Sequence, residues 1–174
     1  MSDDLRQLIG ETQDAFRAEP AKAQARFESV SLLKDGLRSE VRLRDHRLTV
    51  DEPQQLGGTD AGPNPVELIL AALGTCQEIT YKAYATALGI PLDSVSVKLE
   101  GDLDLRGFFA VKDDVRPGYQ AIRGTVRIES GASPEALAQL RDVVNAHCPV
   151  LDIISNPVPV KLDLELAQPA VAAE

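Results

Sequence analysis

Two cysteines are the residues of this sequence most able to do chemistry, and each lies in a distinctive segment. Cys76 belongs to the apolar stretch AALGTCQEITYKAYATALG, and Cys148 belongs to NAHCPVLD. A thiol in an apolar helix is usually a small buried hydrophobic residue, whereas an ionised thiol is a strong nucleophile. At helical spacing both cysteines fall on inward-facing apolar stripes. The residues alone therefore allow either simple packing or a reactive pair.

Metal binding and thioredoxin-like exchange are the less favoured uses of these thiols. The sequence has no C-x-x-C pair, and its only histidines are His46 and His147. A structural zinc site needs four suitably spaced ligands, and thioredoxin-like exchange needs the paired cysteines. We therefore expect no metal and no cofactor. His147, next to Cys148, is either a base for that thiol or a cation favoured by the end of a helix.

A reactive cysteine in this setting would need help to ionise. A free thiol has a pKa of about 8.5, so only a few per cent of it is ionised at neutral pH. Burial raises the pKa further, because the charged form loses its solvation. Lowering the pKa by about two units corresponds to about 2.7 kcal/mol. A nucleophilic role therefore predicts a positively charged side chain beside the thiol.

A long helix over residues 65–88 is predicted to carry the first cysteine. Asn64 can cap its beginning, Pro65 suits its first position, and Glu67 completes a capping box. Gly89 is typical of the residue that ends a helix. On this helix Glu67 is expected to point away from the cysteine.

The remaining pattern predicts an α+β fold with mostly antiparallel sheet, because strands and helices are segregated along the chain. We expect an N-terminal helical arm over residues 1–25, a main domain over residues 26–166 and a tail over residues 167–174. Within the main domain, alternating or β-rich runs predict strands, and Ser133 begins a second helix that ends at Cys148. The expected strands are two runs around Asp35-Gly36, a short run ending at Pro53, and residues 94–105, 119–129 and 158–166.

Composition excludes several classes of partner and predicts a location. The net charge of −9 argues against binding to nucleic acid or to an anionic membrane, because both need a basic surface. No apolar run approaches the length of about 20 residues that spans a bilayer. The N-terminal MSDDLRQLIGE does not look like a secretory signal, so we expect a cytoplasmic protein.

The segment LGGTDAGPNPVELILAALGTC, followed much later by CPV, resembles the OsmC/Ohr family of thiol-dependent peroxidases, which includes organic hydroperoxide resistance proteins. The likeness is to the broader OsmC-like branch and extends from about Arg26 to Leu166. It implies an α+β fold with two antiparallel sheets around a long central helix. It also implies an intertwined homodimer with its active sites at the subunit interface.

The resemblance implies a role in oxidative-stress defence and a role for each site residue. Cys76 would attack an organic hydroperoxide and become a sulfenic acid, and Cys148 would resolve it to a disulfide. An external dithiol, such as a lipoyl-type reductant, would then reduce the disulfide. Family members use an arginine from the N-terminal strands to keep the first thiol ionised, and Arg38 is the candidate, with Arg42 and Arg44 as alternatives.

The family acid is the point where this sequence departs from the pattern. In the peroxidases a glutamate that holds the arginine directly follows Asn-Pro, but here Val66 occupies that position and Glu67 comes one residue later. Glu67 is therefore the candidate acid. The substitution also motivates an alternative function, a non-catalytic binding or redox-sensing protein that holds a hydrophobic small molecule at the dimer interface.

Overall fold

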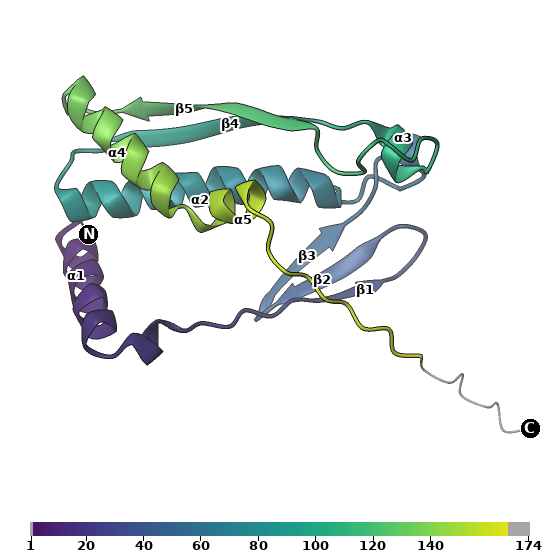
Figure 1. Ribbon diagram of the computed structural model, residues 1–174, viewed down its shortest axis with the longest axis horizontal. Coiled ribbons are helices and arrows are strands. Elements are labelled where there is room, and N and C mark those ends of the chain that lie inside the picture. Colours follow the sequence, from purple (N-terminus) through teal and green to yellow (C-terminus); the bar gives the residue numbers. More distant parts are fainter. Residues whose placement is uncertain (1, 167–174) are drawn as a thin grey trace, which may run out of the picture.

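The computed structural model describes residues 2–166 of the chain and consists of helices and two small antiparallel sheets (Figure 1). The α+β class predicted from the sequence is confirmed. The helical elements are α1 (Ser2–Ala18), η1 (Pro20–Ala23), η2 (Gln54–Leu56), α2 (Pro65–Leu88), α3 (Leu105–Phe108), α4 (Pro134–His147) and α5 (Pro149–Ser155). The strands are β1 (Val30–Leu33), β2 (Ser39–Leu43), β3 (His46–Val50), β4 (Ser94–Asp102) and β5 (Ala121–Glu129).

Helix α2 forms the centre of the molecule. Strand β4 packs along one side of it, and α1, α4 and α5 also pack against it. Strands β4 and β5 form one antiparallel hairpin sheet, while β1, β2 and β3 form a separate three-stranded sheet on the other side of α2 (Figure 1). No helix within residues 2–166 packs against this three-stranded sheet as extensively as α2 packs against β4.

The packed core lies between α2, α4 and the β4–β5 sheet. Tyr81 and Ala85 of α2 meet Leu140 and Val144 of α4, and all four side chains are almost fully buried. Burying Leu140 and Val144 contributes about 1.5–3 kcal/mol each. This contact fixes α4 against α2 and thereby sets where the end of α4 lies relative to the middle of α2.

The boundaries of α2 agree with the sequence prediction. The Asn64 side chain accepts the N–H of Glu67, and the Glu67 side chain accepts the N–H of Asn64, which is a complete capping box. At the other end Gly89 adopts a φ of 70°, a left-handed conformation that favours glycine. Arg6 of α1 adds a hydrogen bond from its Nε to the carbonyl of Thr86, at 3.0 Å.

A buried carboxylate organises the Gly-rich loop that leads into α2. Asp51 accepts hydrogen bonds from the backbone N–H groups of Glu52, Thr59 and Ala61 and from the Thr59 hydroxyl. The Thr59 hydroxyl, followed by the backbone donors, lowers the pKa of Asp51 to about 2. The loop is tight at Gly58, where an added Cβ would lie 1.8 Å from the carbonyl oxygen of Glu52.

Two predicted boundaries in the central part of the chain were wrong. The strand expected over residues 94–105 ends at Asp102, and Leu105 instead begins α3. Asp104 explains the difference, because its side chain accepts the N–H of Arg106 and caps a helical turn. The next strand was expected from residue 119 and begins at Ala121.

The structure differs more from the predictions in the C-terminal part of the described chain. The helix expected to end at Cys148 ends at His147, and Pro149 begins a further helix, α5, because proline suits the first position of a helix. The strand expected over residues 158–166 is absent, although its alternating pattern is present. A strand needs a neighbouring strand to pair with, and this segment joins neither of the two sheets that the structure describes. The tail predicted over residues 167–174 lies outside the described residues.

Candidate active site

The two cysteines, far apart in sequence, meet in the folded chain. Their Sγ atoms lie 3.3 Å apart, and both are free thiols. Cys76 comes from the middle of α2, and Cys148 is the junction residue between α4 and α5. Cys148 is 1% exposed, whereas Cys76 is partly exposed. The arrangement therefore offers one sulfur to a ligand and keeps the other behind it.

The surroundings of Cys76 oppose ionisation within the single chain. Burial raises the pKa of the Cys76 thiol, and the neighbouring Cys148 raises it further. The backbone N–H of Val150, in the first turn of α5, acts in the opposite direction. Among the described residues, no positively charged side chain shifts this pKa. Within residues 2–166, therefore, no cation of the kind that a nucleophilic role requires acts on Cys76.

Arg38, the arginine predicted to assist Cys76, is engaged elsewhere. Its Nη2 forms an ion pair with Asp35 at 2.8 Å, in the turn between β1 and β2. Its Nε is buried and has no hydrogen-bond partner among the described residues. A buried donor without an acceptor is uncommon in folded proteins. The single chain thus leaves this guanidinium incompletely satisfied and does not bring it to the thiols.

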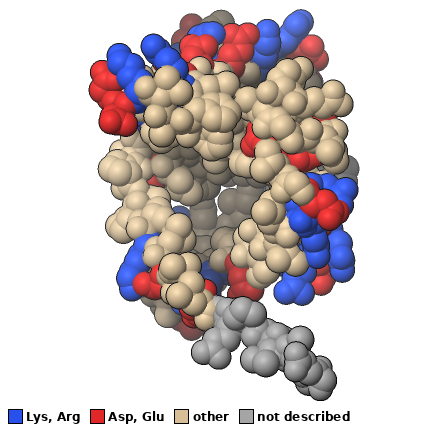
Figure 2. All heavy atoms as spheres, turned by 90° about the vertical axis from the view of Figure 1, so that its right-hand side faces the viewer, with Lys and Arg blue, Asp and Glu red and all other residues tan. Residues whose placement is uncertain are grey.

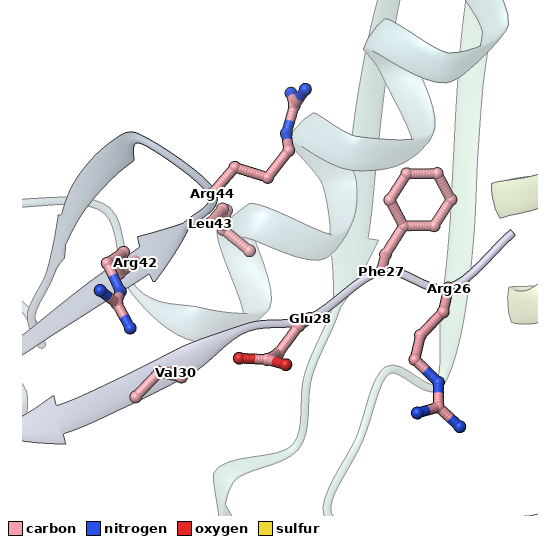
Figure 3. A pocket seen from close by; sticks show the side chains of 7 residues that line it. All are labelled: Arg26, Phe27, Glu28, Val30, Arg42, Leu43 and Arg44. Carbon is pink, nitrogen blue, oxygen red and sulfur yellow. The ribbon is translucent and has the colours of Figure 1, made fainter.

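The alternative arginines, Arg42 and Arg44, line a cavity of about 480 Å³ at one end of the β1–β2 hairpin (Figure 3). Arg26 and the exposed ring of Phe27 line the same cavity, and the guanidinium groups point in different directions. Neither cysteine belongs to its lining. The structure therefore does not bring Arg42 or Arg44 to the thiol pair within one chain.

The candidate acid Glu67 acts as a helix cap, since its side chain accepts the Asn64 N–H at 2.9 Å. Val66, at the family's acid position, contributes its backbone carbonyl, which accepts a hydrogen bond from the Tyr119 hydroxyl at 2.8 Å. His147 stacks on Tyr84, with 5.4 Å between ring centroids. Neither Glu67 nor His147 is among the groups that shift the pKa of Cys76.

A cavity of about 390 Å³ lies between the two helical segments that carry the cysteines, although neither cysteine belongs to its lining. We call it the α2–α5 cavity, because Ile69 and Leu73 of α2 face Leu151 and Ile154 of α5 across it. Leu73 and Leu151 each lie three residues from a cysteine, which is about one helical turn. The remaining lining residues are Arg116, Tyr119, Gln120, Ala121, Ile122 and Ser155. The spacing of Leu73 and Leu151 from the two cysteines is the only feature of the sequence from which the cavity could have been inferred.

A long central helix, two small antiparallel sheets and two touching thiols from separate elements define an α+β protein with a candidate thiol site. The family model for OsmC-like protein matches residues 58–163. The chain therefore belongs to the OsmC-like protein family, and the resemblance seen in its motifs is confirmed.

Solved structures share this fold at low sequence identity. An OsmC-like protein from Mycoplasma pneumoniae superposes with a TM-score of 0.68 at 18% identity, covering 77% of this chain and 90% of that one. An organic hydroperoxide resistance protein OsmC from Legionella pneumophila gives 0.58 at 22% identity, covering 75% and 91%. One from Elizabethkingia anophelis gives 0.58 at 15% identity, covering 77% and 91%. No curated protein gives a significant sequence match.

Proposed function

We propose that this protein is a thiol-dependent peroxidase that reduces organic hydroperoxides. The observation that carries the proposal is the 3.3 Å contact between a partly exposed Cys76 and a buried Cys148. The α2–α5 cavity supports it, because its apolar walls, which include residues one helical turn from each cysteine, suit an organic substrate. Membership of the OsmC-like family, with structural neighbours named organic hydroperoxide resistance proteins, supports a peroxidase-type stress role.

The reaction follows the ordinary chemistry of cysteine oxidation. The Cys76 thiolate attacks the terminal oxygen of the hydroperoxide, the O–O bond breaks, and the alkoxide takes a proton to leave as an alcohol. The Cys148 thiol then attacks the Cys76 sulfenic acid, forming a disulfide and releasing water. Because a disulfide has an S–S length of about 2.05 Å, the sulfurs must approach by little more than 1 Å. An external dithiol, such as dihydrolipoamide, restores both thiols and is itself oxidised to a disulfide.

Ionisation of Cys76 requires a cation, and we assign this role to Arg38 in a homodimer. Three observations support a second copy. The apolar side chains of β1 are exposed, segment 158–166 alternates without a strand partner, and Figure 2 shows a deep hollow at the middle of the molecule. Such exposed apolar surface is typical of an interface. The unpartnered Nε of Arg38 supports its use at such an interface. Glu67 stays a candidate partner for this arginine.

A non-catalytic binding or redox-sensing role is the second candidate. It is favoured by the raised pKa of Cys76 and by Val66 at the acid position. In that case the α2–α5 cavity would hold an apolar molecule while the thiols pack or oxidise slowly. Titration of the Cys76 thiol in the purified full chain separates the two. A pKa well below 7 supports catalysis, and a pKa of about 8.5 or more supports binding.

The direct test is hydroperoxide-dependent oxidation of dihydrolipoamide by the full-length protein. We expect turnover with an alkyl or aryl hydroperoxide, and none after Cys76→Ser. Cys148→Ser is the matched variant, because it should still form the sulfenic acid once but should not make the internal disulfide. Absence of turnover with every hydroperoxide tried, or turnover that persists in Cys76→Ser, would contradict the proposal.

A further inference from the structure

The α2–α5 cavity has apolar walls and one charged lining residue, Arg116. We propose that Arg116 is a specificity-determining residue that binds the carboxylate of an amphipathic ligand whose apolar chain lies along α2 toward Cys76. The carboxylate-binding site is inferred from the residues that line the cavity. The identification of that ligand as a hydroperoxide substrate rests on the proposed function.

The volume and walls of the cavity suit such a chain. Ile69 and Leu73 lie seven and three residues before Cys76 on the same helix, so the α2 wall of the cavity lies about one to two helical turns, up to about 10 Å, from Cys76. Leu151 and Ile154 of α5 form the facing wall. Its volume of about 390 Å³ falls within the usual range of small-molecule sites. An apolar chain along these walls would leave its polar end near the loop before β5.

That loop is held firmly in place. The Tyr119 hydroxyl bonds to the Val66 carbonyl in the first turn of α2, and the Gln120 side chain donates to the Arg116 carbonyl. Helix α3 sits directly on the loop, because a Cβ added to Gly107 would lie 2.7 Å from the Arg116 oxygen. The backbone that carries the guanidinium is therefore fixed relative to the cavity, as a binding residue requires.

The charge of Arg116 has no ion-pair partner in the part of the chain that the structure describes. It forms no ion pair with any residue in the described range 2–166, although most other arginines of the α3–β5 region, such as Arg106 and Arg123, do. Burial, and after it the charge of Glu67, raises the pKa of Tyr119, and the Glu67 carboxylate already accepts the Asn64 N–H. A free guanidinium beside apolar walls is complementary to a carboxylate, which it can bind with two parallel hydrogen bonds.

Arg116 is not the missing activator of the thiol. It is absent from the groups that shift the pKa of Cys76, so its charge acts at the other end of the cavity. A ligand that spans both ends would place its carboxylate at Arg116 and its reactive portion toward Cys76. The same chemistry, an apolar chain with a carboxylate, could belong to the hydroperoxide or to a free dithiol acid, and kinetics distinguish the two.

Binding can be tested without any turnover. The probes are dodecanoate and methyl dodecanoate, titrated into the full-length protein by calorimetry. We expect the acid to bind more tightly than the ester. Arg116→Gln should weaken acid binding about tenfold, the scale of one charge-assisted hydrogen bond at a partly exposed site, and leave ester binding unchanged. Arg116→Lys should keep part of the preference, and Arg127→Gln, an exposed arginine of β5 outside the cavity, should keep all of it.

Steady-state kinetics identify the ligand. A long-chain carboxylic acid hydroperoxide and its methyl ester are compared as substrates, and dihydrolipoate and dihydrolipoamide are compared as reductants. We expect Arg116→Gln to raise KM about tenfold for the acid hydroperoxide alone, with kcat and the ester unaffected. An effect on dihydrolipoate alone would keep the carboxylate site and assign it to the reductant.

The outcomes separate the two proposals. If no hydroperoxide is turned over but dodecanoate binding still depends on Arg116, the peroxidase function fails and the carboxylate site stands. If turnover occurs and the acid-to-ester ratio is the same in wild type, Arg116→Gln and Arg116→Lys, the site is wrong and the peroxidase function stands. Failure of the wild type to prefer the acid also overturns the site. Thermal unfolding of each variant shows whether the substituted protein is still folded.

Discussion

The two halves of this molecule differ in how completely one chain satisfies them. Helices α2 and α4 and the β4–β5 sheet enclose a core in which Leu140 is 0% exposed. In the other half, the β1–β3 sheet and segment 158–166 leave apolar side chains in solvent, and Leu162 is 90% exposed. The first half brings the thiols together. The second half holds Arg38, the candidate cation, away from them.

This contrast separates the contact between the two thiols from the activation of Cys76. Contact between Cys76 and Cys148 depends only on packing within one chain, since α4 is fixed on α2. Activation of Cys76 would depend on surfaces that the single chain leaves uncovered. If the homodimer forms as proposed, the same association would bury the apolar strands and bring a cation to the sulfur.

The largest effect is expected in the packed half, at the thiols themselves. Cys76→Ser should reduce peroxide-dependent turnover to the protein-free background, because no other cysteine can replace the nucleophile. In Cys148→Ser, a single equivalent of hydroperoxide should leave a Cys76 sulfenic acid that dimedone traps and mass spectrometry detects. If dimedone labels Cys148 in the wild type instead, the assigned roles are reversed.

The next effect tests the unpartnered half. Arg38→Gln should raise the pKa of Cys76 in the dimer and lower kcat/KM at least tenfold at neutral pH, because a rise of about two units takes the thiol from mostly ionised to mostly protonated. The pH dependence of thiol alkylation measures the shift. Arg42→Gln is the matched control and should change little. A large effect of Arg42→Gln with none from Arg38→Gln would transfer the role to the neighbouring arginine.

Removal of the C-terminal segment tests the proposed association directly. A chain that ends at Asn156 loses the exposed alternating residues but none of the buried core. We expect its mass in solution, measured by light scattering, to fall from that of a dimer to that of a monomer while its helical signal persists. A monomeric full-length protein would contradict the idea that these strands need a second copy.

A pair of leucine substitutions compares the two halves on one scale. Leu140→Ala should lower the free energy of unfolding by about 2–5 kcal/mol, because it leaves a cavity in the packed core. Leu162→Ala should cost much less in the monomeric state and should act mainly on the dimer dissociation constant. Urea denaturation at several protein concentrations separates these contributions, because only the dimer term depends on concentration.

The smallest effect concerns the loop that leads into α2. The folded pKa of Asp51 is about 2 and its ordinary value is 3.8, so its ionised form stabilises the fold above the ordinary pKa. This contribution should disappear as the pH falls from about 4 to about 2. Asp51→Asn should lower the melting temperature by several degrees at pH 7 and remove the pH dependence in that window. A variant as stable as the wild type at pH 7 would show that the loop does not need the carboxylate.

Local signals were sufficient for the elements that depend on neighbouring residues. The capping box and Gly89 predicted the ends of α2, and the inward direction of both cysteines agreed with their contact. Two local signals were overlooked. Asp104 caps α3, although the alternating pattern predicted that the strand continues through it. Pro149 begins α5, although it was expected only to end the preceding helix. Alternation over residues 158–166 predicted a strand that the single chain does not form, because the segment pairs with neither sheet and a strand requires a partner.

Caps, hydrophobic periodicity and motif spacing in the sequence predicted the α+β class, the family, the long helix with its Glu67 cap, and the two candidate thiols. The 3.3 Å contact between the sulfurs, the ion pair of Arg38 with Asp35 and the cavity that Arg116 lines became visible only once the elements were packed. The reason is physical: distances between remote residues and the free energy of ionisation depend on how elements pack, and packing is not encoded in any one segment.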